Sequence, residues 1–65
     1  MAPRTHADYD KGSAADGRYQ QDAQVCEKQA EANAKEHGMG PYDPTHGAYN
    51  WMYDVCMRSS GYERR

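Results

Sequence analysis

Residues 38–44, Gly-Met-Gly-Pro-Tyr-Asp-Pro, divide the chain into two halves, because two glycines and two prolines within seven positions interrupt any regular helix or strand. The only two cysteines lie at equal distances from this break, since eleven residues separate Cys26 from it and eleven separate it from Cys56. If the break is the turn of an antiparallel helical hairpin, the two thiols meet across the helix interface. A disulfide there closes a loop of about thirty residues, which stabilises a fold by about 3 to 4 kcal/mol.

Two other roles for the cysteine pair stay open in the sequence: two free buried thiols, or metal or redox duty. Redox catalysis favours a C-x-x-C pair at a helix start, where the thiolate is stabilised, whereas Cys26 and Cys56 both fall in the middle of a predicted helix. A structural disulfide is typical of an oxidising compartment. We therefore expect a periplasmic or otherwise exported protein.

The composition explains why such a link is needed. The 65 residues include no Leu, Ile or Phe, only two Val, four Met and one Trp, but six Tyr. A small chain this poor in aliphatic side chains requires a disulfide, a metal or a partner. The net charge of −2 gives no basic face for nucleic acid. No stretch approaches the roughly 20 apolar residues of a membrane span, so we expect no direct membrane insertion.

The first helix is predicted at about residues 16–37, where Ala, Gln, Glu and Lys dominate. Its seam follows helical spacing and consists of small side chains that let a neighbouring helix approach closely. The seam residues are Tyr19, Ala23, Cys26, Ala30, Asn33 or Ala34, and His37.

The second helix is predicted at about residues 44–60, with Gly61 as its stop signal and Tyr62 folding back as the hydrophobic contact that accompanies such a stop. The residues expected to face the first helix are Ala48 or Tyr49, Met52, Cys56 and Ser59, and Val55 lies beside this seam. The fold class is thus all-α, with a disulfide-linked helical hairpin over residues 13–65. Residues 1–12 show no helical or strand period and are predicted to be a flexible, extended N-terminal arm.

Three histidines offer a second kind of site. His37 and His46 flank the predicted turn and, with His6, suggest a small metal- or cofactor-binding module as an alternative function. The other interpretation is that they are solvated polar residues at helix ends, where His37 suits a helix C-terminus. No zinc set with the cysteines is expected, because both cysteines lie about 15 Å along the helices from the turn. We predict no bound metal or cofactor.

Aromatic residues give a sharper signal. The second half of the chain carries Tyr42, Tyr49, Trp51, Tyr53 and Tyr62. On a helix, positions 49, 51 and 53 span much of the circumference, so one partner helix cannot cover all of them. Either these residues form a protein-binding face, or the N-terminal arm folds over and covers them.

The predicted function follows from these features. We expect a non-catalytic interaction protein, an accessory or structural subunit that docks on a larger periplasmic or membrane-associated complex through its Tyr/Trp face. A homo-oligomer is also open. The sequence shows no nucleophile with a base at a usable spacing and no phosphate-binding loop, so an enzyme is not expected.

The segment 53–62, Tyr-Asp-Val-Cys-Met-Arg-Ser-Ser-Gly-Tyr, resembles the Y-x-x-C-M-x-x-x-G-Y ending of many small exported bacterial proteins. Cys26 matches the upstream cysteine of their first helix. Those proteins are uncharacterised or lipoprotein-like, and the resemblance implies a disulfide-linked helical hairpin outside the cytoplasm. No lipobox precedes either cysteine in this chain.

Overall fold

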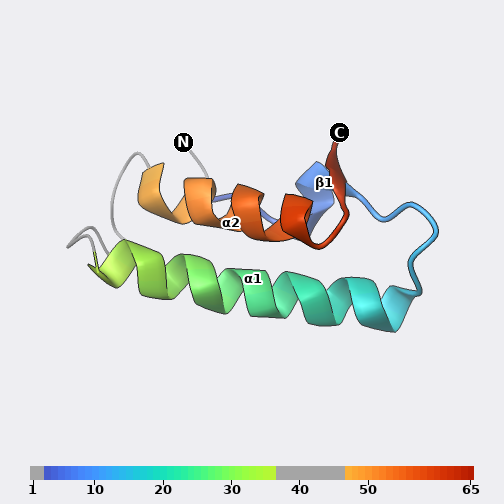
Figure 1. The fold of residues 1–65 in the computed structure, drawn as a ribbon, viewed down its shortest axis with the longest axis horizontal. Helices are drawn as coiled ribbons and strands as arrows, with labels where there is room; N and C mark the ends of the chain where they lie inside the picture. The colour runs from blue at the N-terminus through green and yellow to red at the C-terminus, as the bar shows by residue number, and fades with distance from the viewer. Residues whose placement is uncertain (1–2, 37–46) are drawn as a thin grey trace.

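The computed structural model describes residues 3–36 and 47–65, in which two α-helices lie side by side (Figure 1). The elements in chain order are the 3-10 helix η1 (His6–Asp8), strand β1 (Tyr9–Asp10), α1 (Asp16–Glu36), α2 (Gly47–Ser59) and strand β2 (Glu63–Arg64). The predicted turn at 38–44 lies outside the described residues, as do His37 and residues 44–46 of the predicted helices.

The two helices run antiparallel, as the hairpin prediction requires. Near the start of α1, Asp22 accepts a hydrogen bond from the Tyr62 hydroxyl just beyond the end of α2. In the middle, Cys26 is bonded to Cys56. Near the end of α1, the Asn33 side-chain amide donates to the backbone oxygen of Ala48, at the start of α2. Early residues of one helix therefore meet late residues of the other, and the disulfide-linked helical hairpin is confirmed.

The predicted seam of α1 is confirmed in the described residues. The buried side chains of this helix are Tyr19, Ala23, Cys26, Ala30 and Ala34. Three alanines and a cysteine on this stripe let α2 approach closely, and the Cα atoms of Cys26 and Cys56 lie 5.4 Å apart. This distance falls within the range that a disulfide needs.

The predicted seam of α2 is wrong in part. Cys56 is buried as expected, but Ser59 is exposed and Met52 is only half-buried. The buried residues of this helix are Asn50, Tyr53, Cys56 and Met57. The physical reason is that α2 buries two sides at once, one against α1 and one against the N-terminal segment (residues 3–12), so its buried stripe is turned towards that segment.

The end of α2 follows the sequence signal. Gly61 adopts a positive φ of 98°, a conformation that residues with a Cβ avoid. The backbone N–H of Tyr62 donates to Met57 O, and that of Gly61 donates to Arg58 O. This pattern is a Schellman motif. Tyr62 and Met57 are both part of the buried cluster, so the predicted contact of Tyr62 after the stop is confirmed.

The N-terminal segment is more structured than an extended arm. Thr5 caps η1, because its hydroxyl accepts from the Ala7 N–H while the Asp8 carboxylate accepts from the Thr5 N–H. This capping box leads directly into β1, which pairs antiparallel with β2 in the register Tyr9↔Arg64 and Asp10↔Glu63. The two-stranded sheet ties the N-terminal segment to the chain beyond α2, and the sequence prediction did not include it.

Neither helix in residues 3–36 and 47–65 combines the length and the apolar character that a bilayer crossing requires.

Candidate functional site

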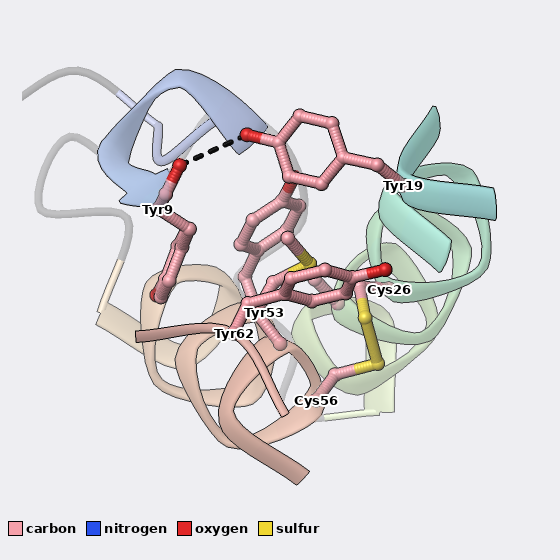
Figure 2. Packing of buried hydrophobic residues seen from close by; sticks show 8 residues of the cluster. Tyr9, Tyr19, Cys26, Tyr53, Cys56 and Tyr62 are labelled. Atoms are coloured by element: carbon pink, nitrogen blue, oxygen red, sulfur yellow. Dashed lines mark hydrogen bonds between the residues drawn. A yellow bond between two sulfur atoms is a disulfide. The ribbon is translucent and has the colours of Figure 1, made fainter. Parts of the chain in front are cut away.

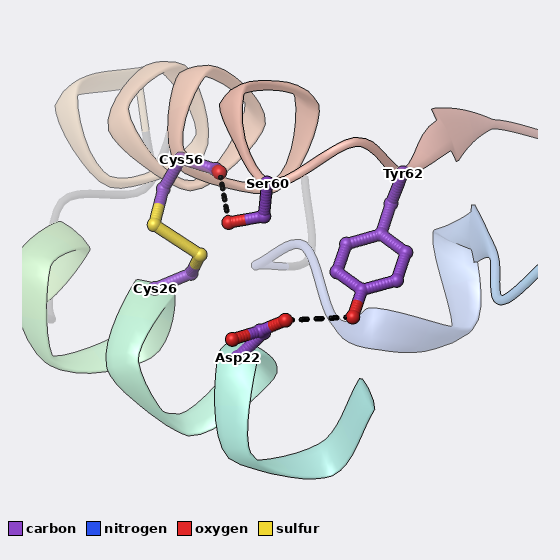
Figure 3. Close-up of a disulfide and its surroundings, with 5 residues drawn as sticks. All are labelled: Asp22, Cys26, Cys56, Ser60 and Tyr62. Atoms are coloured by element: carbon purple, nitrogen blue, oxygen red, sulfur yellow. Dashed lines mark hydrogen bonds between the residues drawn. A yellow bond between two sulfur atoms is a disulfide. The ribbon is translucent and has the colours of Figure 1, made fainter. Parts of the chain in front are cut away.

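The Cys26–Cys56 disulfide lies within the helix interface and not at an open surface (Figure 3). Both cysteines are buried. The Ser60 hydroxyl donates to the backbone oxygen of Cys56 at 3.0 Å. Beside the disulfide, the Tyr62 hydroxyl donates to the Asp22 carboxylate at 2.7 Å and so joins the chain beyond α2 to α1. This placement suits a structural link between the helices, which is the role the spacing predicted.

The core beside the disulfide is built of four tyrosines, one each from the N-terminal segment, α1, α2 and the chain beyond α2 (Figure 2). Tyr9 from the N-terminal segment is fully buried against Tyr53 of α2, with ring centroids 5.9 Å apart. Tyr19 of α1 packs edge-on against Tyr62 at 5.3 Å. The Tyr19 hydroxyl lies within hydrogen-bond distance of two backbone oxygens of the N-terminal segment, those of His6 and Tyr9.

The five aromatic residues predicted to bind a partner lie in different environments. Tyr53 and Tyr62 are in the core, 2% and 5% exposed, so they offer almost no surface. Tyr49 is half-buried and stacks on Tyr53 at 6.1 Å. Trp51 is 61% exposed, and Tyr42 lies outside the described residues. The covering of Tyr53 by Tyr9 corresponds to the alternative in which the N-terminal segment folds over the aromatic residues.

Three large apolar side chains are exposed in the described part of the chain: Val25, Trp51 and Val55, at 46%, 61% and 40%. Helix geometry places them together. Trp51 and Val55 are each two residues from Tyr53, and therefore about 200° around α2 from the side that contacts the N-terminal segment.

The same argument applies to α1. Ala23 and Glu27 line a groove together with residues of the N-terminal segment, and Val25 is two residues from each of them. Val25 precedes Cys26 as Val55 precedes Cys56, so the two valines flank the disulfide on the same side of the antiparallel pair. In Figure 1 the N-terminal segment passes behind α2, so within residues 3–36 and 47–65 it covers one side of the helix pair and not the other. We call the surface formed by Val25, Trp51 and Val55 the open face.

A charged network borders the open face along α2. Asp54 Oδ1 accepts a hydrogen bond from the Tyr9 hydroxyl at 2.7 Å. The same carboxylate pairs with Arg58 Nη1 at 3.6 Å and with Arg64 Nε at 3.8 Å. Burial alone would raise the pKa of Asp54, but the Tyr9 hydrogen bond and the charges of Arg58, Arg64 and Arg4 outweigh it and hold this pKa below its ordinary value. Asp54 is therefore ionised at neutral pH.

On the opposite side, a groove of about 480 Å³ lies between the N-terminal segment and the helices. Tyr49 and Tyr53 line it with Arg4, His6, Gln20 and Glu27. Burial, followed by the proximity of Tyr49 and Glu27, raises the pKa of Tyr53 to about 12. Burial also raises the pKa of Tyr49, with further contributions from Glu27 and Glu31. Both phenols are neutral at physiological pH, so the groove offers hydrogen bonds and ring surface.

The predicted histidine site falls largely outside the described residues, since His37 and His46 both lie there. His6 is exposed and its ring lies edge-on to Tyr19 at 5.6 Å. Within residues 3–36 and 47–65, no three or more His, Cys, Asp or Glu side chains gather into a group able to hold a metal ion.

Comparison with known proteins returned no match: no protein family, no curated protein and no solved structure is significantly similar to this chain.

Three residues that hold the N-terminal segment against α2 were not predicted from the sequence: Tyr9, Asn50 and Asp54. Asn50 is buried, and its side-chain oxygen accepts from the Arg4 backbone N–H at 2.8 Å. Two local signals were present. Thr5 with Asp8 three positions later has the spacing of a capping box, and Asp54 with Arg58 four positions later is an opposite-charge helix pair.

Proposed function

We propose that this protein is a non-catalytic interaction protein, in which a disulfide-linked helical hairpin docks on a larger assembly through the open face. It acts as an accessory or structural subunit of a periplasmic or membrane-associated complex. Trp51 is the main anchor of the contact, and Val25 and Val55 extend its apolar surface.

One observation carries this proposal: three large apolar side chains lie on the surface of a chain that has few of them. The sequence contains two valines, one tryptophan and no Leu, Ile or Phe. Both valines and the tryptophan are exposed, while the core uses Tyr, Ala, Cys and Met. A chain with so little apolar material gains stability by burying it, so its placement on one uncovered side favours burial against a partner. Tryptophan is also among the residues that dominate binding energy at interfaces.

The disulfide and the N-terminal segment support the same function. Both fix the hairpin before any contact is made, and such pre-ordering reduces the entropy cost of association. A stable disulfide also fits the oxidising conditions of an exported protein. Reduction is therefore expected to weaken binding, although both cysteines are buried beneath the surface.

Site-specific photo-crosslinking in cells of the source organism tests the proposal. A benzophenone amino acid is placed at position 25, 51 or 55, and at position 27 as a matched control. Glu27 is exposed on the same helix as Val25 but about 200° around it. We expect one protein to crosslink from all three open-face positions and not from position 27. Equal crosslinking from position 27, or none from the open face, would contradict the proposal.

A further inference from the structure

A patch of positive charge adjoins the open face. Arg58 follows Trp51 by seven residues and Val55 by three, so the three side chains lie on one stripe of α2. Arg64 of β2 reaches the same flank, because its Nε lies 3.8 Å from Asp54 Oδ1. The apolar stripe of α2 therefore continues directly into two guanidinium groups.

The charge on this flank is unbalanced. Arg58 and Arg64 share a single carboxylate, Asp54, and Arg4 is a third cation close enough to lower the pKa of that carboxyl group. Asp54 is already engaged by the Tyr9 hydroxyl. Three guanidinium groups, those of Arg4, Arg58 and Arg64, therefore act on this one carboxylate. The Nε of Arg4 is buried without a hydrogen-bond partner in the described part of the chain.

The two outer arginines keep hydrogen-bonding capacity for a partner. Their distances to Asp54, 3.6 and 3.8 Å, are longer than those of a direct hydrogen bond. The Arg58 and Arg64 side chains are 67% and 51% exposed. Both line a shallow depression of about 590 Å³ between the end of α2 and β2. A guanidinium group presents paired N–H donors that match a carboxylate.

We propose that the partner presents an acidic amphipathic segment, whose apolar side chains pack on Trp51 and Val55 and whose carboxylates pair with Arg58 and Arg64. This inference rests on the proposed function and names the chemistry of the partner. A second copy of the chain fits less well, because an isologous contact places the same patch on both sides. The arginines of the two copies would then repel each other, whereas an acidic segment supplies the negative charge that this flank lacks.

Three synthetic peptides test the inference. They share one Leu/Phe stripe on a 14-residue helical design, lack Trp, and carry Glu, Gln or Lys beside the stripe. Because the protein has a single tryptophan, the fluorescence of Trp51 reports binding at the open face directly. We expect the Glu peptide to bind about tenfold tighter than the Gln peptide, a difference equivalent to one charge-assisted pair. Its affinity should also fall with added salt.

Matched variants locate the effect. The double variant Arg58→Gln/Arg64→Gln should weaken the Glu peptide about tenfold and leave the Gln peptide unchanged. Arg18→Gln is the control, because Arg18 is a similarly exposed arginine of α1 that pairs with Asp22. It should change neither affinity. Far-UV circular dichroism confirms that each variant is folded.

The outcomes separate this inference from the proposed function. Equal binding of the Glu and Gln peptides, both lost in Val55→Ser, overturns the acidic partner but leaves docking at the open face intact. Preference for the Lys peptide, or no binding of the Glu peptide at 1 mM, also overturns it. Sedimentation that shows a dimer abolished by Trp51→Ser assigns the open face to a second copy instead. The crosslinking experiment decides the proposed function independently of all four results.

Discussion

Substitutions of Tyr9 test whether the N-terminal segment is an integral part of the folded unit. Tyr9 is 0% exposed, and its ring packs on Tyr53 while its hydroxyl donates to Asp54. Its backbone oxygen accepts from the Tyr19 hydroxyl at 2.9 Å and from Arg65 Nε at 3.3 Å. Tyr9→Phe removes only the hydroxyl, whereas Tyr9→Ala also removes the ring.

The two variants should differ clearly in the free energy of unfolding. Loss of a hydrogen bond to a charged group costs about 1.5 to 3 kcal/mol, and Asp54 keeps Arg58 and Arg64 nearby, so we expect about 1.5 kcal/mol for Tyr9→Phe. Truncating a buried aromatic ring to alanine costs a further 3 to 5 kcal/mol, roughly. Tyr9→Ala should therefore lose about 5 kcal/mol, which is comparable to the whole stability of a small domain.

Urea unfolding followed by far-UV circular dichroism, with the disulfide intact, measures both losses. The slope for a protein of this size is about 1 kcal/mol per molar urea, so Tyr9→Phe should lower the midpoint by about 1.5 M. Tyr9→Ala should be largely unfolded without urea. Trp51→Ala is the control, because Trp51 is a large aromatic residue but 61% exposed, and it should cost less than about 1 kcal/mol. If Tyr9→Ala has the same urea midpoint as Trp51→Ala, the N-terminal segment does not stabilise the hairpin.

Three further predictions concern the disulfide, the end of α2 and the tyrosine core. Reduction of the bond between Cys26 and Cys56, 30 residues apart, should cost about 3.6 kcal/mol; an unchanged urea midpoint after reduction would refute this. Gly61→Ala should destabilise by about 1 to 2 kcal/mol in urea unfolding, because φ is 98° there, whereas Gly17→Ala within α1 should stabilise by up to about 1 kcal/mol; equal effects would count against the Schellman motif. Burial raises the pKa of Tyr53 from 10.0 to about 12, so the folded state favours the neutral phenol; its contribution to stability is complete below pH 10 and should disappear as the pH rises towards 12. Tyrosine absorbance at 295 nm recorded with urea midpoints checks this, and a constant midpoint from pH 9 to 12 would disprove it.

The disulfide and the seam of α1 were predictable because both depend on spacing along one helix. Cys26 and Cys56 lie at equal distances from a strong break, and small residues recur every three or four positions around Cys26. An antiparallel hairpin converts that symmetry into contact. The end of α2 at Gly61 was also predictable, because a glycine that ends a helix depends only on the residues next to it and not on distant contacts.

The buried side of α2 was not predictable in the same way, because it depends on a segment more than 40 positions away in sequence. Tyr53 is buried by Tyr9, and Asn50 by the backbone of Arg4. Residues 3–12 have no periodicity of their own, so nothing local announces that they cover one side of α2. The sequence therefore left open which of the five aromatic residues the N-terminal segment covers, and the structure shows Tyr53 buried and Trp51 exposed.

The tyrosine core itself explains why the N-terminal segment has to be part of the structure. A buried phenol contributes ring area as an aliphatic side chain does, but its hydroxyl requires a hydrogen-bond partner. Tyr9 finds that partner in α2, Tyr62 finds it in α1, and Tyr19 finds it in backbone oxygens of the N-terminal segment. Each of these bonds joins two different segments, so the hydroxyls specify one arrangement of the chain. A bare hairpin would satisfy only the Tyr62 hydroxyl and would leave that of Tyr19 without its backbone acceptors. These hydrogen bonds therefore hold the N-terminal segment on the side of the helices opposite the open face.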